Sequence, residues 1–195
     1  MSQKKEKRLA HLFDATQCVG CSACVIACAQ VNYPDLLEGE NSGWAWLPAN
    51  IRKATVERAR RPVQILVQCQ QCEDAPCVKV CPFGANVVDP ETGMVKTDPD
   101  RCVGCGYCVT ACPYDVRWMH PKTGLPVKCM GEGCEELVRN GELPACVSVC
   151  PVHARSFGDI DDENSEISRR IASSRCEKIL PQKGTKPNFF VVVSK

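Results

Sequence analysis

Cysteine is the residue type in this chain whose number and spacing could do chemistry. The chain has 195 residues and 17 cysteines. All of them except Cys176 fall into four runs of four, and every run ends in Cys-x3-Cys. The first run, CVGCSACVIAC at residues 18–28, has the spacing of the third, CVGCGYCVTAC at residues 102–112. The second run, residues 69–81, widens one gap, and the fourth, residues 129–150, widens two. Thiols this crowded indicate cross-links or bound metal.

Disulfides and zinc explain the spacing poorly. Disulfides are typical of small secreted chains, but here the total is odd, and neighbours two or three residues apart would close only small, strained loops. Structural zinc sites usually separate two close pairs of ligands by a dozen or more residues. The first run does not divide in that way. Zinc stays open as an alternative for the irregular group at residues 129–150.

Iron–sulfur clusters explain the spacing directly. In the Cys-x2-Cys-x2-Cys-x3-Cys run of bacterial ferredoxins, three cysteines hold one cubane cluster and the fourth reaches a neighbouring one. The short loops let successive thiolates bind separate irons, and the fourth cysteine is expected beyond the loop, at the start of a helix. At four thiolates per cube, the four runs predict four [4Fe–4S] clusters.

The elements between the runs predict which runs belong together. Residues 85–88 and 94–97 are expected to form two strands around a turn at residues 89–93. This hairpin would join the second and third runs as in a two-cluster ferredoxin. The first and fourth runs then pair across the chain, supported by predicted strands in RLAHLFDA (residues 8–15) and ARSFGDI (residues 154–160).

Exchange of the fourth cysteine within each pair of runs predicts four ligand sets. In each set, three cysteines of one run join the last cysteine of its partner run. The sets are Cys18, Cys21, Cys24 and Cys150 (set 1); Cys28, Cys129, Cys134 and Cys146 (set 2); Cys69, Cys72, Cys77 and Cys112 (set 3); and Cys81, Cys102, Cys105 and Cys108 (set 4).

The predicted fold class is α+β, with two interleaved bacterial-ferredoxin-like units of short hairpins and helices around cluster pairs. The predicted divisions are unit A, residues 1–28 plus 129–160; an insertion, residues 29–68, with Trp44 and Trp46; unit B, residues 69–128; and a C-terminal tail, residues 161–195. In the tail we expect one helix over residues 162–180, capped near Asp162 or Asn164, and a strand at Phe189–Val193.

Composition excludes several other functions. The formal charge is +1 and aromatic residues make up 6%, so the chain shows no overall bias toward nucleic acid and has few residues for a conventional core. No segment approaches the roughly 20 apolar residues of a membrane span, and the N-terminus carries no predicted export signal. We find no nucleotide or flavin fingerprint. Redox centres without a substrate site predict an electron-transfer protein that has no catalytic site of its own.

The order of the runs, with CPYDVRWMHPKTG after the third and GELPACVSVCPVHARSFGDI closing the fourth, resembles a known family. It is similar to the four-cluster ferredoxin-like iron–sulfur subunits of the DMSO reductase (molybdopterin oxidoreductase) superfamily, most like those of polysulfide, thiosulfate and dimethyl sulfoxide reductases. Some relatives replace one third-run cysteine by tryptophan and hold a three-iron cluster there. This chain keeps Cys105, so a fourth cubane is expected.

The resemblance implies the ligand exchange and two partners. These are a molybdenum or tungsten bis-pterin catalytic subunit and an integral-membrane anchor that exchanges electrons with quinol. One departure is CMGEGC, which has four residues between cysteines where the family pattern leads us to expect two. Gly131 and Gly133 are expected to make this wider loop easy to build.

The predicted function is therefore transfer of single electrons along four clusters between these partners. Two alternatives are a free-standing soluble polyferredoxin that shuttles electrons between enzymes, and a protein whose clusters are structural. The expected location is the periplasmic side of a membrane, through co-export with the catalytic subunit, with the cytoplasm as the alternative. The basic residues near ligands, which could raise cluster potentials or be solvated, are Lys79, Lys96, Arg101 and Lys128.

Overall fold

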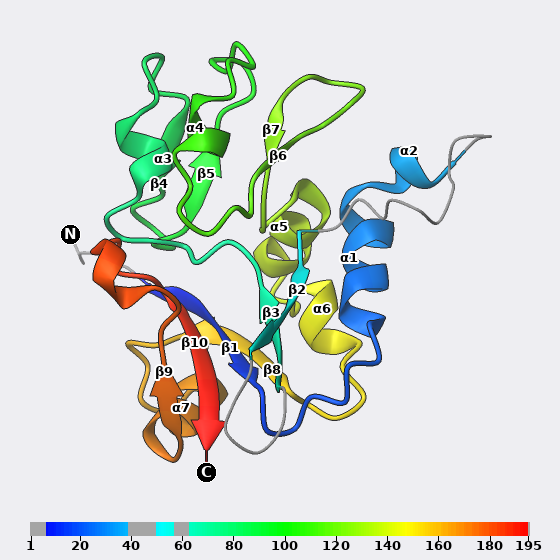
Figure 1. Ribbon diagram of the computed structural model, residues 1–195, viewed down its shortest axis with the longest axis vertical. Helices are drawn as coiled ribbons and strands as arrows, with labels where there is room; N and C mark the ends of the chain where they lie inside the picture. The colour runs from blue at the N-terminus through cyan, green and yellow to red at the C-terminus, as the bar shows by residue number, and fades with distance from the viewer. Residues whose placement is uncertain (1–6, 39–49, 57–62, 195) are drawn as a thin grey trace.

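The computed structural model describes residues 7–38, 50–56 and 63–194, which form small sheets and short helices (Figure 1). Trp44 and Trp46 lie outside these residues. The strands are β1 (Leu9–Asp14), β2 (Arg52–Val56), β3 (Val63–Val67), β4 (Asn86–Val88), β5 (Val95–Thr97), β6 (Trp118–Met119), β7 (Pro126–Val127), β8 (Arg155–Asp159), β9 (Arg175–Glu177) and β10 (Phe189–Ser194). The helices are α1 (Ala23–Asn32), α2 (Pro34–Leu37), α3 (Pro76–Lys79), α4 (Tyr107–Thr110), α5 (Glu132–Arg139), α6 (Ala145–Ser148), α7 (Glu166–Ala172) and a 3-10 turn (Pro181–Lys183).

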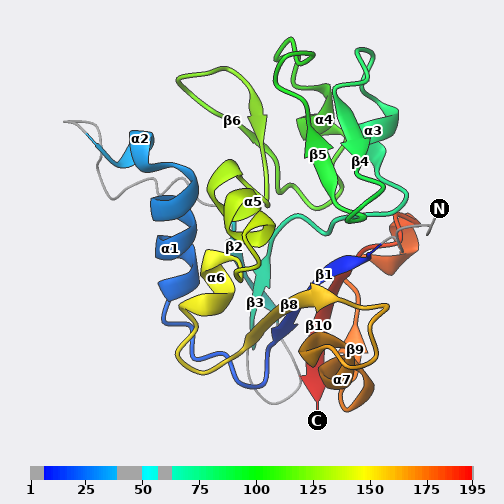
Figure 2. The ribbon, with the colours of Figure 1, turned by 180° about the vertical axis from the view of Figure 1, so that it is seen from behind.

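A four-stranded sheet of order β8-β1-β10-β9 joins the beginning of the chain to its end. Strand β1 pairs antiparallel with β8 and parallel with β10, so segments far apart in sequence lie side by side. Alternate residues of β1 face opposite sides, as strand geometry requires. Ala10 and Leu12 pack with Ile167 of α7, whereas Phe13 packs among cysteines on the other face. Figure 2 shows α7 beside this sheet, near β9. The sheet therefore separates α7 from the cysteine runs.

The predicted strands are confirmed. Strands β1 and β8 lie within the segments predicted before the first run and after the fourth, and β10 covers the strand predicted near the C-terminus. The predicted hairpin is β4–β5, in which Val88 pairs with Val95. The mixed α and β character with short elements is confirmed as well. None of the helices in the described segments is long and apolar enough to cross a bilayer.

The helix predicted over residues 162–180 is too long. Helix α7 begins after Ser165, whose Oγ accepts a hydrogen bond from the Ser168 N–H at 3.1 Å, and it ends at Ala172. The chain then enters β9, where Cys176 pairs with Val192 of β10. Serines at 173 and 174 are poor helix formers, and pairing with the sheet edge satisfies the backbone beyond them. Cys176 therefore lies in a strand and not in a helix.

The helices of the cysteine runs begin earlier than expected, before the third cysteine and not at the fourth. In the second, third and fourth runs the third cysteine lies inside a short helix, and the fourth follows that helix. In the first run, α1 contains both Cys24 and Cys28. Helix α1 packs against α6 and α5, whereas α3 packs against α4. The predicted insertion also contains structure that composition concealed: the end of α1, helix α2 and the β2–β3 hairpin.

The glycines of the widened fourth run have a different role from the one expected. Gly131 precedes α5 and Gly133 lies in its first turn, and neither adopts a positive φ. A Cβ on Gly133 would lie 2.2 Å from the carbonyl oxygen of Val31, and one on Gly131 would lie 2.6 Å from Oδ1 of Asn32. Glycine is therefore needed for the close approach of α5 to α1, and not for an unusual turn.

Candidate metal centres

The structure gathers cysteines from separate runs around three pockets. One is lined by the cysteines of set 1, one by those of set 3 and one by those of set 4. Each pocket therefore combines three cysteines of one run with the last cysteine of another. All 17 cysteines of the chain are described and free of disulfides. Among the described residues, no three His, Cys, Asp or Glu side chains stand close enough together to hold a single metal ion.

The four cysteines of set 2 are buried together between α1, α5 and α6. Nδ2 of Asn32 lies 3.4 Å from Sγ of Cys134 and 3.7 Å from Sγ of Cys28. Burial raises the pKa of the Cys28 thiol to about 12, and the neighbouring sulfurs of Cys146 and Cys134 add to this rise. Burial also raises the pKa of Cys129, again with Cys146 and Cys28 as neighbours. Set 2 is thus a compact group of mutual neighbours.

Several N–H groups point at these sulfurs. The Ala85 N–H donates to Sγ of Cys81 and the Ala154 N–H to Sγ of Cys150, each at 3.3 Å. Both donors lie four residues after the last cysteine of their run. At set 2 the Asn50 N–H lies 3.4 Å from Sγ of Cys28, and Nε2 of Gln68 lies 3.5 Å from Sγ of Cys129. Donors of this kind stabilise thiolate ligands and tune cluster potentials.

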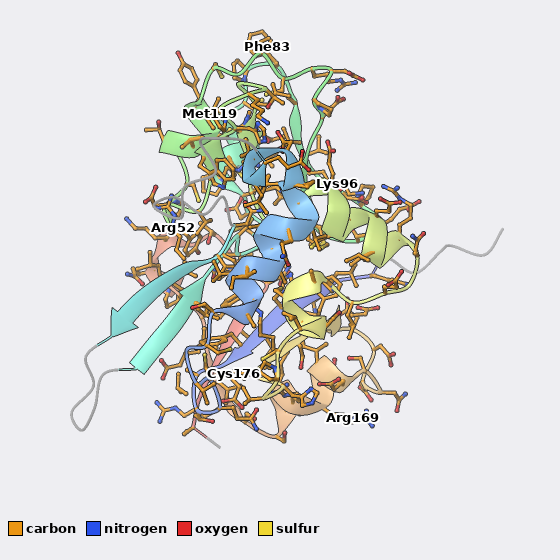
Figure 3. The ribbon with its side chains drawn as sticks, turned by 90° about the vertical axis from the view of Figure 1, so that its right-hand side faces the viewer. Arg52, Phe83, Lys96, Met119, Arg169 and Cys176 are labelled. Carbon is orange, nitrogen blue, oxygen red and sulfur yellow. The ribbon has the colours of Figure 1, made fainter. Side chains whose placement is uncertain are left out.

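Exposure differs along the series of sets. Cys21 of set 1 and Cys105 of set 4 are the exposed cysteines, and all four cysteines of set 2 are buried. Both exposed cysteines have an exposed valine nearby, with 67% exposure for Val19 and 60% for Val103. Phe83, which lines the set 4 pocket, lies at the opposite end of the molecule from Cys176 and its sheet (Figure 3). Sets 1 and 4 therefore reach the surface, and set 2 is enclosed.

Sequence reasoning missed two buried arginines. Arg117 is 2% exposed and Arg155 is 3% exposed. Within the described residues, Nε of Arg117 and both Nε and Nη1 of Arg155 have no hydrogen-bond partner. Burial alone lowers the pKa of Arg155, but the sulfurs of Cys146, Cys24 and Cys129 outweigh it and raise the pKa overall. A repeated spacing could have revealed both residues, because each lies five positions after the last cysteine of its run, in CPYDVR and CPVHAR.

The basic residues chosen from sequence mostly have other partners. Lys79, Lys96 and Arg101 form ion pairs with the carboxylates of Asp74, Asp89 and Asp98, respectively. Their side chains are 40–65% exposed. Lys128 differs, because it is 5% exposed and its Nζ donates to the carbonyl oxygen of Cys129 at 3.3 Å. Of the four, it alone is buried beside a cysteine set.

Comparison with known proteins shows the class to which this chain belongs. Residues 64–160 match the family model for a 4Fe-4S dicluster domain. A polysulfide reductase chain of Wolinella succinogenes is 39% identical over 191 residues, which cover 97% of this chain and 96% of that protein. Protein NrfC of Escherichia coli K12 is 37% identical over 194 residues, covering 95% and 80%. The thiosulfate reductase electron transfer subunit PhsB of Salmonella typhi is 44% identical over 165 residues, covering 82% and 79%.

These similarities extend over most of the chain and of each relative. The chain therefore belongs to the family of 4Fe–4S iron–sulfur electron-transfer subunits of oxidoreductases. The family resemblance inferred from the cysteine runs is confirmed.

Proposed function

We propose that this chain passes single electrons along four [4Fe–4S] clusters, held by sets 1 to 4, between a molybdenum or tungsten bis-pterin catalytic subunit and a quinol-linked membrane subunit. The observation that carries the proposal is the gathering of cysteines from separate runs into four groups of four.

The groups follow one another as a row. Buried side chains of sets 1 and 2, including Cys24 and Cys146, share one apolar cluster. Another apolar cluster contains Cys129 of set 2, Cys69 of set 3 and Cys108 of set 4. Cys69 of set 3 acts electrostatically on Cys129 of set 2, and Arg117 acts on cysteines of both set 3 and set 4. Together these relations support the order 1-2-3-4. Because electron tunnelling falls exponentially with distance, a row of close neighbours can conduct where its two ends alone could not.

The chain's own residues fit the proposed clusters. Buried thiols resist ionisation, as the raised pKa of Cys72, about 12, illustrates, mainly because of its burial. A bound metal favours the thiolate form. Arg117 and Arg155 line cysteine pockets, and anionic clusters there would offset the charge of the nitrogens that have no partner among the described residues. When bound, the clusters supply one-electron redox chemistry. The protein holds the ligands, donates N–H groups to sulfur and excludes water from set 2.

The two interleaved units belong to the proposal. Pairing of β1 with β8 and packing of α1 against α6 support a unit A built from the first and fourth runs. The β4–β5 hairpin and packing of α3 against α4 support a unit B built from the second and third. Residues 29–68 and 161–195 would then be additions to these units, with β10 completing the sheet of unit A.

The partners would meet the row at its exposed ends. Val19 beside Cys21, and Val103 with Tyr107 beside Cys105, give each end an exposed apolar rim. Relatives whose names make them components of a polysulfide reductase and of a sulfite dehydrogenase support assembly with further subunits. We place the assembly on the periplasmic side of a membrane, by co-export. A free-standing polyferredoxin would instead purify as a stable monomer.

Purification under anaerobic conditions tests the proposal. We expect about sixteen iron atoms per chain, four for each of four clusters, and co-purification of a pterin-containing subunit. Replacing Cys112 with serine should change the spectrum of the cluster held by Cys69, Cys72 and Cys77. A change in the cluster of Cys102 instead would contradict the exchange of ligands, and an iron content far below sixteen would contradict the four clusters.

Set 2 should respond to the amide of Asn32. Asn32→Ala removes the donor shared by Cys28 and Cys134, so the reduced cluster loses stabilisation. We expect its reduction equilibrium to fall about tenfold, which is about 59 mV for one electron. Potentiometric titration followed by electron paramagnetic resonance measures the shift. Asn164→Ala, at an exposed asparagine, is the control. Equal shifts of the reduction potential in the two variants would show that Asn32 does not tune the cluster at set 2.

A further inference from the structure

We propose that one buried cation stands at each of the three junctions of the row, and that each holds the reduction potentials of the two neighbouring clusters above the values they would otherwise have. The cations are Arg155 between sets 1 and 2, Lys128 between sets 2 and 3, and Arg117 between sets 3 and 4. The inference rests on the proposed function, because it needs the four clusters.

Arg155 lies between sets 1 and 2. It lines the set 1 pocket together with Cys24, and its charge also acts on Cys146 and Cys129 of set 2. Nη2 donates to Oε1 of Gln68, a neutral group. Within the described part of the chain Arg155 forms no ion pair with a carboxylate. A buried, unpaired charge is costly, so an anionic neighbour is needed to offset it.

Arg117 repeats this arrangement between sets 3 and 4. It lines the set 3 pocket together with Cys77 and Cys69, and its charge also acts on Cys108 of set 4. Both terminal nitrogens donate to Oδ1 of Asn86 at 3.0 Å, which is again a neutral acceptor. No carboxylate in the described residues pairs with it. The same spacing after the last cysteine thus delivers one guanidinium to each unit.

Lys128 occupies the remaining junction. It directly precedes Cys129 of set 2, and its charge also acts on Cys77 of set 3. Its Nζ donates to a backbone carbonyl, and none of the ion pairs among the described side chains includes Lys128. An oxidised cluster with four thiolates carries a charge of about −2, and reduction adds one more negative charge. A cation within low-dielectric surroundings therefore favours the reduced form of both clusters beside it.

Charge-removing variants of the full chain, with its clusters loaded, test this inference by potentiometric titration. Arg155→Gln should lower two of four one-electron steps, and Arg117→Gln should lower the other two. Each step should move by at least tenfold in equilibrium constant, which is about 59 mV for one electron. Lys128→Met should lower the potentials of sets 2 and 3, which is one step from the pair affected by Arg155→Gln and one from the pair affected by Arg117→Gln. Arg155→Lys and Arg117→Lys, which keep the charge, should restore the steps to within threefold of wild type.

Arg101→Gln is the matched control. Like Lys128, Arg101 directly precedes the first cysteine of a run, but its side chain is 65% exposed and paired with Asp98. Solvent screens such a charge, so its removal should move each step by less than threefold. Shifts in the buried variants no larger than in this control, or equal shifts of all four steps in every variant, would overturn the inference.

Cluster loss also gives a clear result. If a glutamine variant loses about eight irons, those of its two neighbouring clusters, while the lysine variant retains about sixteen, the charge is required at that junction, as inferred. Loss of all clusters, or equal loss in the lysine variant, would overturn it. The proposed function fails on a separate observation, namely wild-type protein that lacks about sixteen irons.

Discussion

Gly133→Ala is expected to destabilise the fold and to disrupt set 2, which lies inside the proposed row of clusters. The new Cβ would lie 2.2 Å from the carbonyl oxygen of Val31 and 2.9 Å from its Cγ1. The closest atom belongs to the backbone of α1 and cannot rotate aside as a flexible side chain could. Helix α5 must therefore move away from α1. Cys134 follows directly after Gly133 and moves with it. We expect destabilisation of about 3 kcal/mol, the upper part of the range for overpacking, and loss of the cluster at set 2.

Thermal unfolding and iron analysis measure this effect. Gly158→Ala is a matched control, because its Cβ would approach only the side chain of Ile167, at 3.2 Å. That flexible group can adjust, so the control should cost less than about 1 kcal/mol and keep all its iron. If Gly133→Ala were as stable and as iron-rich as the control, the close contact between α5 and α1 would not be a requirement of this fold.

Removal of Cys146 is expected to interrupt conduction. Cys146 is buried in α6 and belongs to set 2, which is flanked by other sets on both sides. Cys146→Ala should lower the iron content by about four atoms. An electron would then have to cross from set 1 to set 3 in one step. Because tunnelling falls exponentially with distance, we expect end-to-end transfer to slow by orders of magnitude.

Turnover of the co-purified complex with a quinol donor, alongside iron analysis, measures this loss. Cys176→Ala is the control, because Cys176 lies in β9 and outside the four sets. It should leave iron content and turnover unchanged. A Cys146→Ala complex that loses one cluster but turns over at the wild-type rate would exclude set 2 from the electron path.

Regular local patterns made much of the fold predictable. The strand predicted before the first run is β1, and the turn predicted at residues 89–93 identified the β4–β5 hairpin. The cysteine spacing predicted which thiols would gather, and the structure brings those groups together. That these groups bind clusters remains the proposal made above. Spacing works so well here because a cluster ligand depends on a short loop, which is a local feature.

Features that depend on distant segments were missed. The helix predicted through Cys176 ends early because β10, which is remote from α7 in sequence, offers β9 a pairing edge. Arg117 and Arg155 share a position five residues after the last cysteine of their run, but their burial becomes visible only in the folded chain. The role of Gly133 depends on the position of α1, about a hundred residues away. Each miss involves a contact between segments that lie far apart in sequence.

The interleaving of the chain sets an order for its biogenesis. All ligands proposed for sets 3 and 4 lie within residues 69–112, so a nascent chain can present them together soon after they leave the ribosome. Cys28 must wait for Cys146, and Cys18 for Cys150. Strand β1 also stays without its parallel neighbour until residues 189–194 have been made. If the proposed sets bind clusters, maturation therefore starts in the middle of the polypeptide, and the first cysteines synthesised are among the last to gain their complete ligand sets.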